Sequence, residues 1–174
     1  MQTFVALLRG INVTGSGLLR MTELAALCVD AGFQKVRTYI QSGNVIFESK
    51  LREARVQATL EEALAIKMGK PVAVFVRTPD EMVAILGANP FPDREPSKVA
   101  VMFLHGAPPS DLLSKTVAPG GEQVQPGKRE IYVFYPDGMG RSKLKLPVPS
   151  TATTVRNINT VAKLVGLASP PVIQ

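Results

Sequence analysis

The sequence predicts an α+β fold of two subdomains, each a mainly antiparallel sheet with helices packed on it. Three observations lead to this prediction. The 174 residues are 45% hydrophobic and 20% charged, which is typical of a globular chain that buries a core. Strand-like and helix-like patterns alternate along the chain, and a proline-rich segment separates two similar halves. We therefore expect a first subdomain at residues 1–88, a linker at residues 89–97 and a second subdomain at residues 98–174.

The first half begins with a strand at residues 3–8, whose nearly continuous apolar run suits a strand in the middle of a sheet. A glycine-rich loop leads to a helix at about residues 21–31, where apolar residues recur at helical spacing. Residues 37–47 are expected to form a hairpin around the turn Ser42-Gly43, because glycine accepts the positive φ that tight hairpin turns need.

A long helix capped by Ser49 is expected to run to about Met68, and a strand with valines at alternate positions follows at residues 72–76. The first half thus has the order strand, helix, strand, strand, helix, strand. This is the split β-α-β order of ferredoxin-like domains, and we expect strands one and three to be central. A further short helix is predicted to begin at the capping residue Thr78.

The second half repeats much of this order, so we predict a second ferredoxin-like subdomain. Its expected elements are a strand at residues 98–104, a short helix at 110–116, a hairpin with strands at 122–125 and 131–135, and a last helix at about 153–167.

The composition favours some function classes and disfavours others. A net charge of +6 biases the protein toward anionic partners. The single cysteine, Cys28, cannot form an internal disulfide, and His105 is the only histidine, so we predict no metal site and no cofactor. The apolar run at the start is too short for a signal peptide or a membrane span. We therefore expect a cytoplasmic protein with no membrane partner.

The first candidate site is the segment from Arg9 to Gly17, where a strand passes through a glycine-rich turn into a helix. This is the general plan of a phosphate cradle, although the segment has neither the Walker spacing nor G-x-G-x-x-G. Arg9 and Asn12 are its candidate ligand-binding residues. The alternative is a loop that merely crosses the end of the sheet.

The hairpin carries a row of hydrogen-bonding side chains on one face, and polar residues continue through its turn. We expect this row to line a cleft rather than to face open solvent. The candidate ligand-binding residues are Arg37, Tyr39, Gln41, Ser42 and Asn44.

The segment Tyr135–Leu144 is the stretch of the chain best suited to an anion. Two glycines would let backbone N–H groups form a concave nest, and a serine and two basic residues would add a hydroxyl donor and positive charge. The candidate residues are Gly138, Gly140, Arg141, Ser142 and Lys143. The alternative is a turn at the end of a strand, followed by a solvated basic turn.

Arg156 and Asn157, at the predicted start of the last helix, are further candidates for ligand binding. Apolar residues at helical spacing in that helix must face the core, which directs its polar residues elsewhere. These polar residues form either a binding edge or ordinary caps and surface.

Four segments, in this order along the chain, carry a resemblance to a known family. They read A-L-L-R-G-I-N-V, V-R-T-Y-I-Q-S-G-N-V-I-F, P-D-G-M-G-R-S-K-L and R-N-I-N-T-V. The chain resembles the domain-of-unknown-function 1697 family of bacterial proteins over most of its length. The resemblance implies a two-subdomain α+β fold and supplies no established activity. Ile158 stands where that family tends to have an aromatic residue, which disfavours base stacking by the last helix.

Three function classes remain open. The favoured one is binding of a phosphorylated small molecule, a nucleotide or RNA through the glycine-rich basic loops. The others are a scaffold or interaction protein without a small ligand, and an enzyme without a recognisable catalytic motif. Ser142 and Lys145 have the S-x-x-K spacing, but the companion signatures of serine acylases are missing, so no serine nucleophile is predicted. Either a monomer or a homodimer is compatible with the sequence.

Overall fold

The computed structural model describes residues 1–12 and 18–169. The chain divides into two compact units, one formed by Met1–Met82 with the C-terminal segment from Leu164, the other by Val83–Lys163. In this division, residues 89–97 lie within the second unit. The predicted role of residues 89–97 as a linker between two subdomains stays a prediction.

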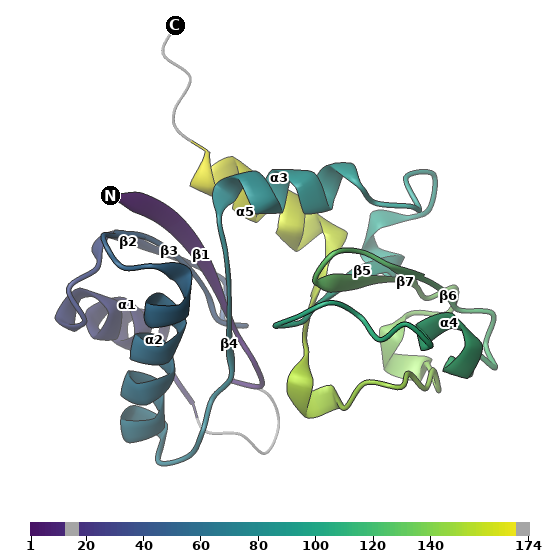
Figure 1. Ribbon diagram of the computed structural model, residues 1–174, viewed down its shortest axis with the longest axis horizontal. Helices are drawn as coiled ribbons and strands as arrows, with labels where there is room; N and C mark the ends of the chain where they lie inside the picture. The colour runs from purple at the N-terminus through teal and green to yellow at the C-terminus, as the bar shows by residue number, and fades with distance from the viewer. Residues whose placement is uncertain (13–17, 170–174) are drawn as a thin grey trace, which may run out of the picture. The chain divides into compact units, whose positions relative to one another are not determined.

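The first unit contains a four-stranded antiparallel sheet with the order β2-β3-β1-β4 (Figure 1). Its strands are β1 (Gln2–Leu8), β2 (Gln34–Tyr39), β3 (Asn44–Ser49) and β4 (Val74–Arg77). Helices α1 (Met21–Asp30) and α2 (Glu53–Met68) lie on the same side of this sheet. The order of the strands and the placement of β1 and β3 at the centre confirm the predicted ferredoxin-like arrangement.

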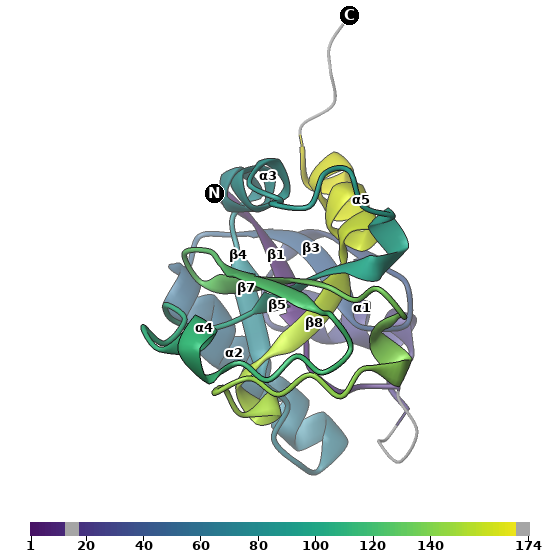
Figure 2. The same cartoon turned by 90° about the vertical axis from the view of Figure 1, so that its right-hand side faces the viewer.

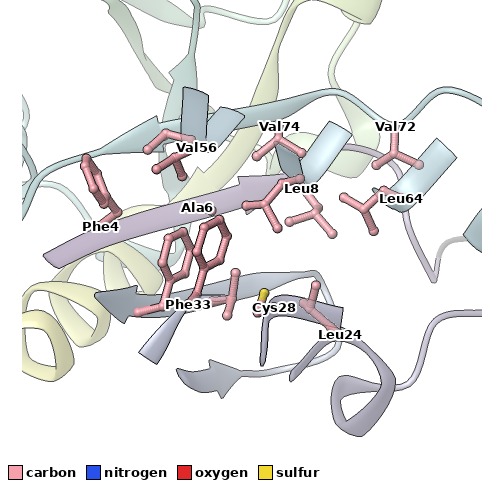
Figure 3. Packing of buried hydrophobic residues seen from close by; sticks show 14 of the residues in the cluster. Phe4, Ala6, Leu8, Leu24, Cys28, Phe33, Val56, Leu64, Val72 and Val74 are labelled. Atoms are coloured by element: carbon pink, nitrogen blue, oxygen red, sulfur yellow. The ribbon is translucent and has the colours of Figure 1, made fainter. Parts of the chain in front are cut away.

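The core of the first unit lies between the sheet and the two helices. Alternate side chains of β1, including Phe4 and Leu8, are buried there together with residues from both helices (Figure 3). The ring of Phe33 stacks on that of Phe47 at 4.3 Å between centroids. Cys28 is fully buried in this core, as expected of a small apolar side chain.

The first turn of α2 differs from the prediction. Ser49 does not cap the helix, because its hydroxyl accepts the N–H of Leu51 at 3.0 Å and closes a turn two residues before α2 begins. At the other end, Gly69 has φ +71 and its N–H bonds to the carbonyl of Ala65, which is the left-handed ending that glycine favours.

The second unit contains a sheet of the same order, β6-β7-β5-β8, again antiparallel throughout. Its strands are β5 (Val99–Phe103), β6 (Gln123–Pro126), β7 (Glu130–Phe134) and β8 (Thr154–Asn157). Its helix α4 (Leu112–Lys115) is short. Helix α3 (Pro79–Gly87) begins at Thr78 as predicted, since the Thr78 hydroxyl accepts the N–H of Glu81 and the Glu81 carboxylate accepts that of Thr78.

The predicted start of the last helix is wrong. Residues 154–157 form β8, which pairs with β5, and α5 (Ile158–Ala168) begins only after them (Figure 2). Thr154 and Val155 are β-branched, and such residues fit a pleated sheet better than a helix. Asn157 then caps α5, because its side-chain oxygen accepts the N–H of Thr160 at 2.9 Å.

The connection between β7 and β8, residues 135–153, is the main difference between the two units. In the first unit, the corresponding connection from β3 to β4 contains the long helix α2. Residues 135–153 are all described, and they contain only the short 3₁₀ turns Met139–Arg141 and Ser150–Ala152. The sheet of the second unit is therefore covered here by irregular chain.

None of the described helices combines the length and the apolar composition that crossing a membrane requires.

Candidate functional site

Asn12 joins the first loop to the hairpin turn. Its side-chain amide donates to the carbonyls of Leu19 and Gln41, both at 2.7 Å, and its side-chain oxygen accepts the N–H of Leu19 at 2.6 Å. The residue has φ +56, a conformation that asparagine tolerates better than most residues. These contacts bring two predicted candidates, Asn12 and Gln41, together and occupy the side chain of Asn12. The glycine-rich part of the loop, residues 13–17, lies outside the described residues.

The hairpin turn is fixed by buried contacts. Asn44 is fully buried, and its side-chain amide donates to the carbonyl of Tyr39 at 2.9 Å and to the hydroxyl of Ser42 at 3.1 Å. Gly43 has φ +88 and lies against Ile11 and Leu8 so closely that a Cβ atom would be 2.6 Å from Ile11 Cδ1. The sequence motif around this turn thus has a structural explanation.

The remaining candidates of the first unit are more exposed. Arg37 is exposed, and its guanidinium donates to the carbonyl of Leu167 near the end of α5. Such a bond satisfies one of the free carbonyls at the end of a helix. Tyr39 and Arg9 are half-buried, and the backbone N–H of Arg9 donates to Ala73.

Arg156 and Asn157 lie at the junction of β8 and α5. Arg156 is 7% exposed, and its guanidinium donates to the hydroxyl of Thr154 at 2.8 Å and to the carbonyl of Val155 at 2.9 Å. Burial lowers the pKa of Arg156 to about 10, so the side chain remains charged at neutral pH. Asn157 caps α5. Both side chains thus contribute to the local structure of this junction.

The segment Gly138–Lys143 borders a hollow of about 200 Å³ beside the end of β7. Arg141 and Lys143 both line the hollow and are exposed, and neither forms an ion pair within the described part of the chain. The other residues around the hollow are Pro119, Gly120, Glu122, Tyr135, Pro136, Asp137, Gly138 and Ser142. The two cations are therefore available to a ligand.

The backbone of this segment does not have the expected nest geometry at every position. Gly138 has φ +82, a conformation that favours glycine, but its N–H donates to the carbonyl of Tyr135. The N–H of Ser142 donates to Met139 within the 3₁₀ turn. These two N–H groups are bound within the turn, so they are not directed at a common anion position.

Glu122 is the residue of this hollow that sequence reasoning missed. Its carboxylate accepts the hydroxyl of Ser142 and the N–H of Gly120, both at 2.9 Å. The hydrogen bond from its own backbone N–H is the largest cause that lowers the pKa of Glu122; desolvation opposes it, and the hydrogen bonds from Ser142 and Gly120 lower the pKa further. The twenty residues between Glu122 and Ser142 give no local pattern, although an acid directly after Gly120-Gly121 is a weak signal of a turn-binding carboxylate.

A second, more apolar hollow of about 280 Å³ adjoins the first and shares Tyr135 and Ser142 with it. Its other residues are Met102, Met139, Leu144, Leu146, Val148, Ser150, Thr153 and Val155. Burial, with a contribution from the charge of Glu122, raises the pKa of Tyr135 to about 12, so the phenol is protonated at neutral pH.

A third hollow, of about 540 Å³, lies between α1 and α2 in the first unit. Apolar residues and small alanines form much of its lining, and Ile66 within it is 79% exposed. Four charged residues also line it: Glu23, Asp30, Glu62 and Lys67. Of these, Lys67 and Glu23 form an ion pair at 3.9 Å.

Among the described residues, no group of three or more histidine, cysteine, aspartate or glutamate side chains is placed to hold a metal ion. Together, the two ferredoxin-like sheets and the hollow with two uncommitted cations define a two-unit α+β protein with a candidate anion site. Residues 1–132 match the profile of the family described as protein of unknown function (DUF1697), and the chain belongs to this family.

Among curated proteins, none matches this chain. A solved structure, that of the conserved bacterial protein SP0830 from Streptococcus pneumoniae, is similar to it with 22% sequence identity and a TM-score of 0.77. The similarity covers 97% of this chain and 99% of the other. At this identity, the comparison shows that the two proteins share a fold.

Proposed function

We propose that this protein binds a small anionic ligand, such as a phosphorylated small molecule or a nucleotide, in the hollow beside Gly138–Lys143. The observation that carries the proposal is that Arg141 and Lys143 line one hollow, while neither forms an ion pair within the described residues. Two free cations beside a concave surface attract a phosphate or a carboxylate, and an arginine can bind two oxygens of either at once.

The acidic residues of the hollow restrict where an anion can bind in it. Glu122 already accepts the hydroxyl of Ser142, and Asp137 lies in the same lining. A ligand anion must therefore bind against Arg141 and Lys143 and either avoid Glu122 or displace it from Ser142. We expect modest affinity for a bare anion, because like charges close together oppose its binding.

The experiment is a calorimetric titration with inorganic phosphate, glucose 6-phosphate, adenosine 5′-monophosphate and a short single-stranded RNA. A charge-assisted hydrogen bond is worth about 1.5 to 3 kcal/mol, so Arg141→Ala should weaken binding of the best of these probes roughly ten- to a hundredfold. Arg55→Ala is the matched control, because Arg55 is an exposed arginine in the other unit. Equal affinities for the two variants, or no probe that binds better than millimolar, would exclude this site.

A second candidate function is binding of a partner protein through the groove between α1 and α2. Apolar residues line part of the groove, among them Ile66, which is 79% exposed. Of the acidic residues in the lining, neither Asp30 nor Glu62 forms an ion pair within the described part of the chain. Charge complementarity points to a cationic amphipathic helix as the occupant, since such a helix lays its apolar face into a groove and its basic residues against acidic edges.

A fluorescent model peptide, with leucine at helical spacing and lysine elsewhere, tests this candidate by anisotropy. Ile66→Ser should weaken its binding at least about fivefold, because one well-buried aliphatic contact contributes more than 1 kcal/mol. Val29→Ser should not, since Val29 is exposed on α1 but lies outside the groove lining. Equal binding by the two variants would show that the peptide does not use this groove.

A further inference from the structure

The apolar hollow of the second unit exists because irregular chain takes the place of a helix. In the first unit, α2 buries Val56, Leu60 and Leu64 in the core next to the sheet. In the second unit, the corresponding connection is residues 135–153, which contain two short 3₁₀ turns instead of a long helix. Met102 of β5 and Val155 of β8, both half-buried, pack against the core of the second unit and also line this hollow.

The wall of this hollow is held in place at defined points. The N–H groups and carbonyls of Val117 and Lys145 bond reciprocally, each at 2.9 Å, which anchors the middle of the connection. The N–H of Leu144 donates to the hydroxyl of Ser142 at 3.1 Å. Leu144, Leu146 and Val148 pack against the core of the second unit. The hollow is thus preformed, and a ligand would not have to order its wall.

The polar hollow and the apolar hollow meet at Tyr135 and Ser142, which line both. We propose that the ligand is an amphiphilic anion, whose charged group lies against Arg141 and Lys143 and whose apolar body fills the hollow lined by Met102, Leu146 and Val155. This inference rests on the proposed anion site and specifies the class of ligand that it takes.

Two features of the lining fit such a ligand. Methionine side chains, here Met102 and Met139, adapt their shape to irregular apolar groups. Tyr135 lines both hollows, and its hydroxyl is a donor that could serve the group linking the charged head to the apolar body. A bare anion would leave the apolar hollow unused.

The experiment is a calorimetric titration of the full chain with inorganic phosphate and with methyl, butyl and hexyl phosphate. Affinity should rise about fourfold for each methylene buried, until the hollow is full. Hexanol, which has the chain but no charge, should bind at least about tenfold more weakly than hexyl phosphate. Arg141→Ala should weaken all four phosphates by a similar factor.

Val155→Phe is designed to fill the hollow from β8 without touching the charged segment. It should remove the gain with chain length and leave methyl phosphate binding unchanged. Met102→Ala, which enlarges the hollow, is the second variant should Val155→Phe fail to fold. In this variant, the alkyl phosphate that binds most tightly should have a longer chain than in the wild type.

The outcomes separate the two proposals. If inorganic and methyl phosphate bind and affinity does not depend on chain length, the anion site stands and the amphiphilic ligand is wrong. The amphiphilic ligand is also wrong if affinity still rises with chain length in Val155→Phe. It is equally wrong if Met102→Ala binds the same chain length best as the wild type does. If none of the phosphates binds, the proposed function fails and the inference fails with it.

Discussion

Gly43 is the residue on which the first loop and the hairpin turn depend. It combines φ +88 with close contacts to Ile11 and Leu8, so any side chain there is both strained and crowded. Gly32 is a matched comparison, because it has φ +91 and, apart from its chain neighbours, no atom of the described residues lies within 4 Å of an added Cβ. The left-handed conformation costs a non-glycine residue about 1 to 2 kcal/mol, and overpacking costs about 1 to 3 kcal/mol more.

We therefore expect Gly43→Ala to lower the free energy of unfolding by roughly 2 to 5 kcal/mol and Gly32→Ala by only about 1 to 2 kcal/mol. Urea unfolding followed by circular dichroism measures both values. Equal losses in the two variants would mean that Ile11 moves aside easily and that the turn tolerates a side chain.

Glu122 is expected to weaken anion binding in the hollow beside Gly138–Lys143. Its carboxylate occupies the Ser142 hydroxyl and adds negative charge to a hollow that otherwise offers two cations. Glu122→Gln should strengthen phosphate binding about fivefold or more, since it removes a like charge and weakens the competition for Ser142.

Asp137→Asn is the control for Glu122→Gln. Asp137 lines the same hollow and its side chain forms no hydrogen bond with the described residues, so this variant removes charge without freeing Ser142. Calorimetry with inorganic phosphate should show a smaller gain for it. If Glu122→Gln binds phosphate more weakly than the wild type, the carboxylate is part of the ligand site rather than a competitor.

At the scale of the elements, the junction of β8 and α5 depends on the cap formed by Asn157. Because the side-chain oxygen of Asn157 accepts the N–H of Thr160, Asn157→Ala should cost about 1 kcal/mol of stability, whereas Asn157→Asp should keep most of it. Asn159→Ala is the control, since Asn159 is an exposed asparagine in the first turn of the same helix. Urea midpoints that drop equally for positions 157 and 159 would refute a capping role.

The same junction explains why the hydrophobic pattern alone mislocated the helix. Ile158, Val161 and Leu164 are buried at helical spacing, as predicted. Thr154 and Val155 precede these residues, and no turn residue such as glycine or proline separates strand from helix in the sequence. The pairing of β8 with β5 decides this boundary, and those partners lie more than fifty residues away in the sequence.

At the scale of the whole molecule, stability should fall at alkaline pH. Burial raises the pKa of Cys28 from 9.0 to about 12, and burial with the charge of Glu122 raises that of Tyr135 from 10.0 to about 12. Folding favours the protonated form of both groups, so their contribution is complete below pH 9 and is lost as the pH rises to 12.

Each such group can remove up to about 1.4 kcal/mol per pH unit from the free energy of unfolding within its window. Urea titrations at pH 8, 9, 10 and 11 should therefore show a progressive loss. Cys28→Ala should flatten the curve between pH 9 and 10, where the thiol titrates first in the unfolded chain. A pH-independent free energy of unfolding over this range would contradict the burial of both groups.

Local patterns in the sequence were sufficient for the four strands of the first unit and for three of the four strands of the second, whereas β8 was predicted as part of the last helix. The apolar run of β1, the Ser42-Gly43 turn and the alternation of β4 are short-range features, and the ferredoxin-like arrangement follows from their order along the chain. Net charge and the basic residues of Gly138–Lys143 likewise pointed to the segment whose cations line a hollow. These features are visible because periodicity and turn chemistry report on neighbours within a few residues.

The tertiary structure alone decided how that segment can act. Two hydrogen bonds join residues far apart in the sequence: Ser142 to Glu122 and Asn12 to Gln41. The apolar hollow is likewise lined by residues from distant segments, such as Met102 and Val155. A polar residue in a loop has the same local pattern whether its side chain is free or bound to a distant partner. Within the described residues, Arg141 and Lys143 form no ion pair, whereas the side chains of Asn12 and Asn44 are hydrogen-bonded. This difference arises only when the folded sheets bring the loops together.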